Sequence, residues 1–173
     1  MKNSLIFLLL LSVTPSIAQE IPRFKKFPIL ETGAQAYFPS EPTWEVSIST
    51  DSSKIYVAEV IHDNHNYGVI FVDLKESLGE DSTAWEDMIT NYLGFLNTEV
   101  FKFNEVTPVA FGHVLESYPI AVGGIEYGKD DNLSEFKVKA WADSRHIAVM
   151  YVGNVRDMNL NFQELFLNGF RFP

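Results

Sequence analysis

A β-hairpin pattern toward the C-terminal end constrains this fold more than any other stretch of the chain. Residues 136–142 alternate small or apolar side chains with three larger ones, Lys137, Lys139 and Trp141. This period of two is typical of a half-buried strand. Residues 147–152 are apolar at every position, which indicates a central strand covered on both faces. We therefore expect the core to be built against both faces of this hairpin.

Shorter runs rich in β-branched and aromatic residues predict further strands. These runs are residues 34–38, 44–48, 54–61, 67–74, 100–105, 109–116 and 120–127. Gly112, Gly123 and Gly124 interrupt the last two runs, and glycines inside strands mark bulges or close backbone approach. Sequential strands at this spacing usually form an antiparallel meander.

Two stretches predict helices. Residues 84–96 have apolar side chains at helical spacing, and Thr83 with Glu86 fits a capping box at the start. The apolar stripe consists of Trp85, Met88, Ile89, Tyr92, Leu93 and Leu96. We expect it to cover the sheet, because the alternative, an exposed aromatic groove, would leave the sheet bare.

The second predicted helix covers residues 160–167. Either Asn159 or Asn161 can cap it, with Glu164 completing a box from Asn161, and Gly169 can end it in a left-handed turn. Its expected buried face is Phe162, Leu165 and Phe166. The predicted fold class is therefore α+β: a largely antiparallel twisted sheet of about six or seven strands packed against two main helices, in an α/β/α-like sandwich.

The predicted domain organisation has three parts. Residues 1–18 resemble a secretory signal peptide, with Lys2, a short apolar run and small residues before Gln19. Residues 19–33 form an extended lead-in with a basic cluster, which either docks to a partner or lies along the domain edge. Residues 34–173 form a single domain. We expect an exported protein, periplasmic or extracellular, that does not span a membrane.

Charge and cysteine content exclude several classes of protein. The formal net charge is −10, and it becomes −11 if Lys2 leaves with the signal peptide. So acidic a chain repels nucleic acid, since phosphate binding depends on Lys and Arg. The chain has no cysteine, so disulfides contribute nothing to its stability.

Two polar segments invite a metal interpretation. Residues 62–66 carry His62, Asp63 and His65 in a short turn, but the sequence marks no distant further ligand. Residues 130–134 begin like a calcium loop, yet Glu135 stands where that loop needs glycine. We expect both to be polar turns, and we predict no metal and no cofactor. Asn132 also begins a glycosylation sequon, which matters only in a eukaryotic source.

Three segments together resemble the PsbP-like superfamily, which includes Mog-type and DcrB-like proteins. They are YFPSEP at 37–42, YGVIFVDL at 67–74 and FLNGFRF at 166–172, and the order of predicted elements between them is also similar. The resemblance covers nearly the whole chain after the leader. It implies an antiparallel sheet sandwiched by helices and mostly non-enzymatic members that bind or assist other proteins. It carries no functional residue over to this chain.

Two function classes follow from the residues. The first is a non-catalytic binding or accessory protein that interacts with another protein or an envelope component. The second is an unrecognised hydrolase, whose candidate groups are Ser117, Ser144, His113, His146 and Asp143. None of these serines stands in a nucleophile elbow, which favours the binding protein over the enzyme.

The candidate binding residues are Lys137, Lys139 and Trp141. Alternation along one strand places them in a row, and an aromatic residue beside two cations is typical of a protein contact. The alternative is that Trp141 belongs to a second core layer and the lysine stems pass alongside it.

Overall fold

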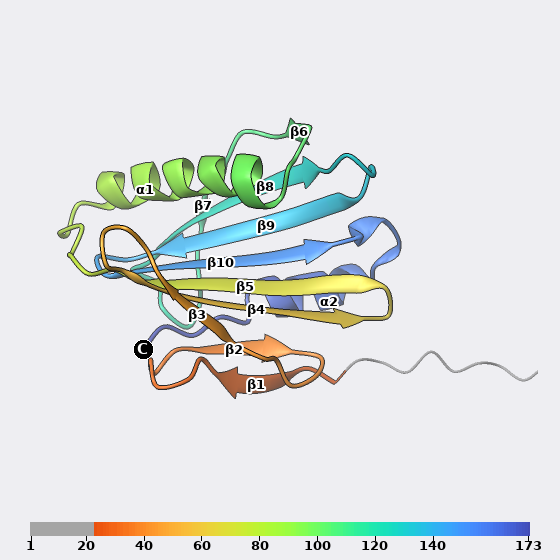
Figure 1. Ribbon diagram of the computed structural model, residues 1–173, viewed down its shortest axis with the longest axis horizontal. Helices are drawn as coiled ribbons and strands as arrows, with labels where there is room; N and C mark the ends of the chain where they lie inside the picture. Colours follow the sequence, from red (N-terminus) through yellow and green to blue (C-terminus); the bar gives the residue numbers. More distant parts are fainter. Residues whose placement is uncertain (1–22) are drawn as a thin grey trace, which may run out of the picture.

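An eight-stranded antiparallel sheet forms the middle layer of the protein (Figure 1). The computed structural model describes residues 23–173, so the expected leader at 1–18 and its cleavage before Gln19 lie outside the described part. The strands are β3 (Glu45–Ile48), β4 (Lys54–His62), β5 (His65–Asp73), β6 (Glu105–Val106), β7 (Ala110–His113), β8 (Val122–Lys129), β9 (Glu135–Ala142) and β10 (His146–Gly153). Their order is β3-β4-β5-β10-β9-β8-β6, with β7 also pairing with β8.

Helices cover the two faces of this sheet. On one face lies α1 (Ser82–Phe95), over β8 and β9. On the other lie α2 (Leu160–Leu167) and a small separate sheet of β1 (Lys25–Pro28) and β2 (Gln35–Phe38). The structure thus confirms the predicted fold class, an α+β protein with an antiparallel sheet and two main helices.

Strand β10 lies at the centre of the sheet, between β5 and β9. Val149 is opposite Ile70 on one side and Ala140 on the other. All residues of β10 except His146 are buried, as expected for a strand covered on both faces. The predicted hairpin of β9 and β10 is confirmed.

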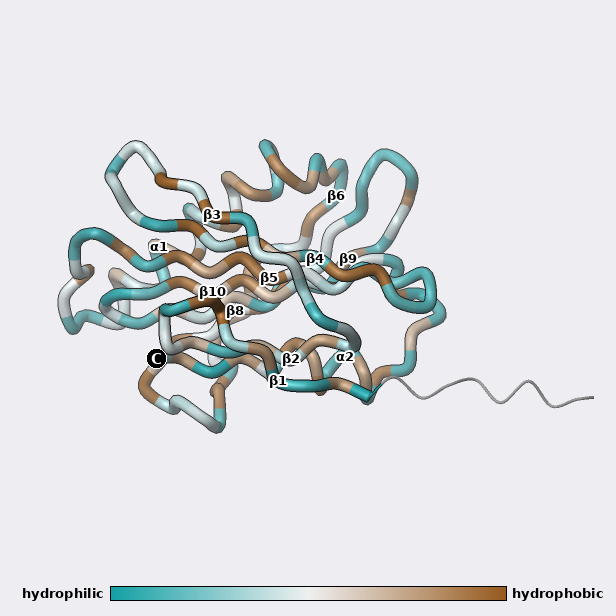
Figure 2. Tube along the Cα trace, turned by 60° about the horizontal axis from the view of Figure 1, so that its bottom comes forward, coloured by the Kyte–Doolittle hydropathy of each residue, from teal (hydrophilic) through white to brown (hydrophobic). Residues whose placement is uncertain are grey.

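Two apolar clusters use alternate residues of the same strands. On the α1 side, Val138, Ala140, Ile147 and Val149 pack with Trp85, Ile89, Leu93 and Leu96. On the α2 side, Ala148, Met150 and Val152 pack with Phe38, Phe166 and Phe170. In Figure 2 hydrophobic colour is concentrated along the central strands, and hydrophilic colour is common in the loops.

The helix ends differ in detail from the sequence prediction. Asp81 caps α1, accepting a hydrogen bond from the backbone N–H of Thr83 at 2.9 Å, so the predicted capping role of Thr83 is wrong. Asn159 caps α2, as one of the two alternatives predicted. Gly169 does not adopt a positive φ, so the left-handed turn predicted at the end of α2 is not present. Leu165, predicted to be buried, is about half exposed, and Gln163 is buried instead.

The segment after α1 is not the strand predicted at 100–105. The helix continues into a π-helical turn at Leu96–Val100, closed by the N–H of Phe101 donating to the C=O of Leu96 at 2.8 Å. Phe101 and Phe103 then stack on each other at 5.0 Å. Phe103 lies over Gly128, where a Cβ atom would come within 2.3 Å of its ring. Tertiary packing of these rings therefore accounts for the apolar pattern.

Glycines in the sheet admit large side chains or bend the strand, as the sequence indicated. At Gly123 a Cβ atom would come within 2.2 Å of the Trp141 ring. Gly112 has φ +95°, and the pairing of β7 with β8 shifts register around it between Phe111 and His113. This shift is the predicted bulge.

The lead-in belongs to the domain edge. Strand β1 lies within residues 19–33 and pairs with β2, which is bridged in turn to Arg171 near the C-terminal end. Phe24 and Phe27 pack against the α2-side cluster. Residues 23–33 thus lie along the domain edge, as one of the two alternatives predicted.

We predict that Leu93→Ala destabilises the fold by about 2–5 kcal/mol, because it removes a fully buried side chain from the α1-side cluster. The matched control is Phe95→Ala on the same helix, where Phe95 is 54% exposed and should cost far less. Urea denaturation of both variants measures the two effects. Equal losses would show that α1 does not pack as described.

Candidate functional site

The predicted binding row lies on the α2 side of β9. Lys137, Lys139 and Trp141 are 8%, 5% and 1% exposed, and Trp141 belongs to the α2-side core cluster. The prediction that the three share one face is confirmed. The prediction that they form an exposed row for a partner protein is wrong, because Trp141 is packed in the core and both lysine side chains are recessed against Glu164 of α2. Trp141 is thus a core residue that packs over Gly123.

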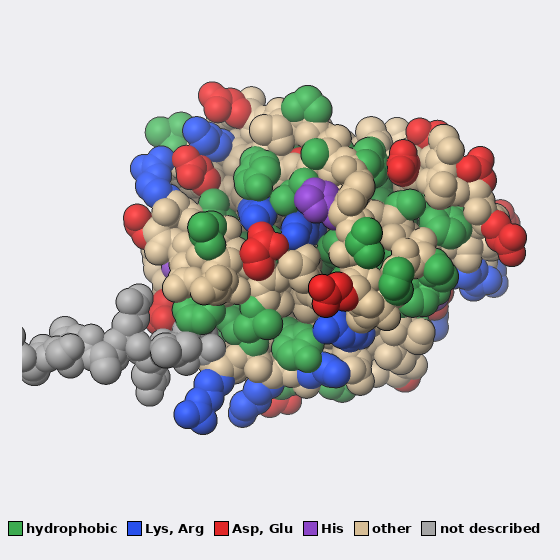
Figure 3. Space-filling view, turned by 180° about the vertical axis from the view of Figure 1, so that it is seen from behind, with side chains coloured by type: hydrophobic (Ala, Val, Ile, Leu, Met, Phe, Trp, Pro, Cys, Tyr) green, Lys and Arg blue, Asp and Glu red, His purple; other side chains and the backbone are tan. Residues whose placement is uncertain are grey.

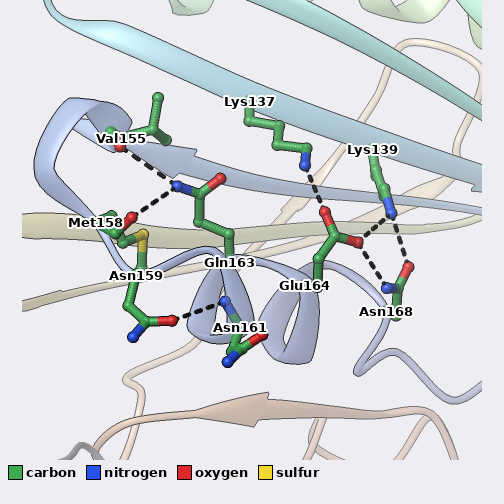
Figure 4. Close-up of polar contacts among 9 residues, drawn as sticks. All are labelled: Lys137, Lys139, Val155, Met158, Asn159, Asn161, Gln163, Glu164 and Asn168. Atoms are coloured by element: carbon green, nitrogen blue, oxygen red, sulfur yellow. Dashed lines mark hydrogen bonds and ion pairs between the residues drawn. The ribbon is translucent and has the colours of Figure 1, made fainter.

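The two lysines converge on one carboxylate of α2 (Figure 4). Lys137 forms an ion pair with Oε1 of Glu164. Lys139 donates to Oε2 of Glu164 at 3.0 Å and to Oδ1 of Asn168 at 2.9 Å. Asn168 donates in turn to Oε2 of Glu164 at 3.0 Å. Glu164 lies on α2 and Asn168 is the C-cap residue one turn later, so both face the lysine row.

The short helix that carries this carboxylate is fixed at its start. Oδ1 of Asn159 accepts from the N–H of Asn161 at 2.9 Å. The amide of Gln163, which is buried, donates to the C=O groups of Val155 and Met158 at 3.3 Å each (Figure 4). These bonds tie the start of α2 to the turn before it and hold Glu164 over β9.

The lysines change the acidity of their neighbours. Burial alone would raise the pKa of Glu164, but hydrogen bonds from Lys137 and Lys139 outweigh burial and lower this pKa to about 2. Burial lowers the pKa of His113, and the positive charge of Lys139 lowers it further. Glu164 is therefore ionised and His113 neutral at neutral pH. Figure 3 shows Lys or Arg atoms recessed beside a histidine near the centre of this face.

Among the candidate hydrolase groups, Asp143 and His146 come together but no serine joins them. Nδ1 of His146 lies 3.1 Å from both carboxylate oxygens of Asp143, so these two residues form an acid–imidazole pair. Ser117, however, donates to the C=O of Phe170 at 3.2 Å. Within residues 23–173, no serine hydroxyl hydrogen-bonds to His113 or to His146. Asp143 also accepts from the N–H of Arg145 at 2.7 Å, so it holds the turn between β9 and β10.

Two hollows lie at the end of the sheet formed by the β8–β9 turn. The first, of about 370 Å³, is lined by the apolar side chains of Val106, Tyr127, Phe136 and Val155, with charged residues around them. The second, of about 440 Å³, lies where residues 63–65, 132–135 and 154–157 meet. It unites the two polar turns noted in the sequence, which gave no sign that they are neighbours in space.

Polar bonds hold the second hollow together. Nδ1 of His65 contacts the C=O of Asn154 at 2.8 Å, and the amide of Asn154 donates to the C=O of Asn64 at 3.0 Å. Asp63 and Asn64 both have positive φ, which is typical of a tight hairpin turn. Over the described part of the chain, no group of three or more His, Cys, Asp or Glu side chains could hold a metal ion.

Sequence reasoning missed Glu164, Asn168 and the first hollow. The sequence pattern places Glu164 in a helix-capping box with Asn161 and gives it no partner on the sheet. Two lysines on a strand rich in apolar residues nevertheless require a nearby counter-charge. That requirement was the available signal. The residues of the first hollow come from distant segments, so no local pattern marks them.

No protein-family model and no curated protein matches the sequence. No helix within residues 23–173 is long and apolar enough to cross a membrane.

A buried acid also lies on the opposite face of the sheet. Glu126 of β8 is 2% exposed, and its Oε1 has no hydrogen-bond partner in the described residues. Oδ1 of the buried Asn97 likewise has none. Burial raises the pKa of Glu126 above its usual value of 4.5.

This acid predicts a pH dependence of stability. Between the unfolded pKa and the raised folded pKa, the folded state binds more protons, so the free energy of unfolding falls as pH rises. We expect Glu126→Gln to be more stable than the unmodified chain at about pH 8 and to lose that advantage near about pH 4. Urea denaturation at several pH values tests this, with the exposed Glu76→Gln as control. Parallel pH profiles for all three chains would refute it.

Proposed function

We propose that this protein is an exported, non-catalytic binding or accessory protein that engages an apolar group of another protein or of an envelope component. The observation that carries the proposal is the hollow of about 370 Å³. Its volume falls within the range of ligand pockets, which is about 300–1,000 Å³. Its apolar lining and charged surroundings match the usual layout of a binding site.

Charged residues around this hollow pair with one another. Lys129 lies 3.7 Å from Glu135 and 3.9 Å from Glu105, and Arg156 lies 3.3 Å from Glu135. Because these charges already have partners, an apolar group can enter between them without leaving an ion uncompensated. The expected leader at residues 1–18 supports export, and the PsbP-like resemblance supports a role in assisting other proteins.

A hydrolase is the second candidate, favoured only by the contact between Asp143 and His146. This function needs a nucleophile beside the imidazole. His146 instead stacks on Phe71 at 5.6 Å, as a packed turn residue does. Ester hydrolysis that is lost in His146→Ala would support the enzyme over the binding protein.

We predict that Val106→Glu abolishes capture of the natural partner, because it places a charge in the apolar hollow. The bait is the chain from Gln19, applied to envelope and culture-medium fractions of the source cell. The matched control is Val46→Glu. Val46 and Val106 are similarly exposed, at 52% and 48%, but Val46 lies on β3, at the opposite edge of the sheet from the hollow.

Thermal melts should show both variants folded. A partner lost with Val106→Glu and retained with Val46→Glu supports the hollow as the binding site. A partner retained by both variants would contradict the proposal.

A further inference from the structure

We propose that Lys137 and Lys139 form a site for one oxyanion, either a carboxylate or a phosphate group. This site is separate from the apolar hollow and does not depend on its function. The first reason is charge. Two ammonium groups share the single carboxylate of Glu164, which leaves one positive charge uncompensated in this network.

Other titratable groups near the lysines do not remove that excess. His113, at the end of β7, is neutral because its pKa is lowered. Tyr127 presents its ring to Lys137, with Nζ 5.8 Å from the ring centre. Holding a buried net charge is costly unless a counter-ion accompanies it. An anion would supply that counter-ion locally, although the net charge of the whole chain is −10.

The second reason is hydrogen-bonding capacity. Each ammonium has three N–H donors. Lys139 uses two of its donors, for Glu164 and Asn168, and Lys137 uses one, for Glu164. The remaining three N–H groups have no protein acceptor within residues 23–173. Nε1 of Trp141, the next residue of the row, is also a buried donor without a partner there.

All of these groups are donors, which determines the kind of ligand. A cation would be repelled by the two ammonium groups, and a neutral group would bring no negative charge to balance them. An oxyanion accepts several N–H bonds at once and gains charge assistance from the ammonium groups. A polyanion such as nucleic acid remains excluded by the overall acidity of the chain. The ligand is therefore a single anionic group.

Substitutions of Glu164 and of Lys139 should change the anion affinity in opposite directions. Its carboxylate competes with an incoming anion for the same ammonium groups, so Glu164→Gln should increase anion affinity. Lys139→Met removes donors and charge, so it should decrease affinity. A general effect of salt on stability would not strengthen the response to the anion in Glu164→Gln while weakening it in Lys139→Met.

The experiment is thermal unfolding of the whole mature chain in increasing sodium phosphate or sodium acetate, with ionic strength held constant by sodium chloride. A ligand that binds only the folded state raises Tm in a concentration-dependent manner. We expect the rise in the unmodified chain and in Lys102→Met, where Lys102 is 62% exposed and paired only with Glu99. We expect it at lower anion concentration in Glu164→Gln and not at all in Lys139→Met.

If Lys139→Met does not fold, Lys137→Met replaces it with the same expectation. A response to phosphate alone identifies a phosphate group, and a response to acetate alone identifies a carboxylate. The proposal is overturned if Tm responds equally in all variants, or if Glu164→Gln weakens the response.

Discussion

The hydrogen-bonded ladder around β10 is the constraint on which the rest of this structure depends. Pairing with β5 on one side and β9 on the other fixes which residues point to each face. Ala148, Met150 and Val152 then belong to the α2-side core, while Ile147 and Val149 belong to the α1-side core. A slip of one residue would exchange the two sets, so both cores and both helices depend on one register.

The same register places the lysine row. With Val138 and Ala140 directed to α1, Lys137 and Lys139 must face α2, where the apolar surroundings make charge costly. Glu164 offsets part of that cost. Tyr127 connects this network to the apolar hollow, since its ring contacts Lys137 and also lines the hollow.

Local patterns predicted most of the sheet, because alternation along β9 and continuous apolarity along β10 reflect burial directly. They failed at residues 100–105, where Phe101 and Phe103 pack on the sheet without joining it. They also could not show what covers the lysine row. Glu164 reaches Lys139 across 25 positions of sequence, and only the tertiary fold brings the two together. For the same reason the alternation could not decide whether Trp141 is an exposed anchor or part of a core layer.

Residue-resolved amide hydrogen exchange under native conditions tests the central role of the β10 ladder most directly. Amides that open only with global unfolding exchange slowest. The account predicts the slowest exchange in β10 and in the facing positions of β5 and β9, with faster exchange in the edge strands β3 and β6. Protection of β3 equal to that of β10, or fast exchange at the centre of β10, would contradict the account.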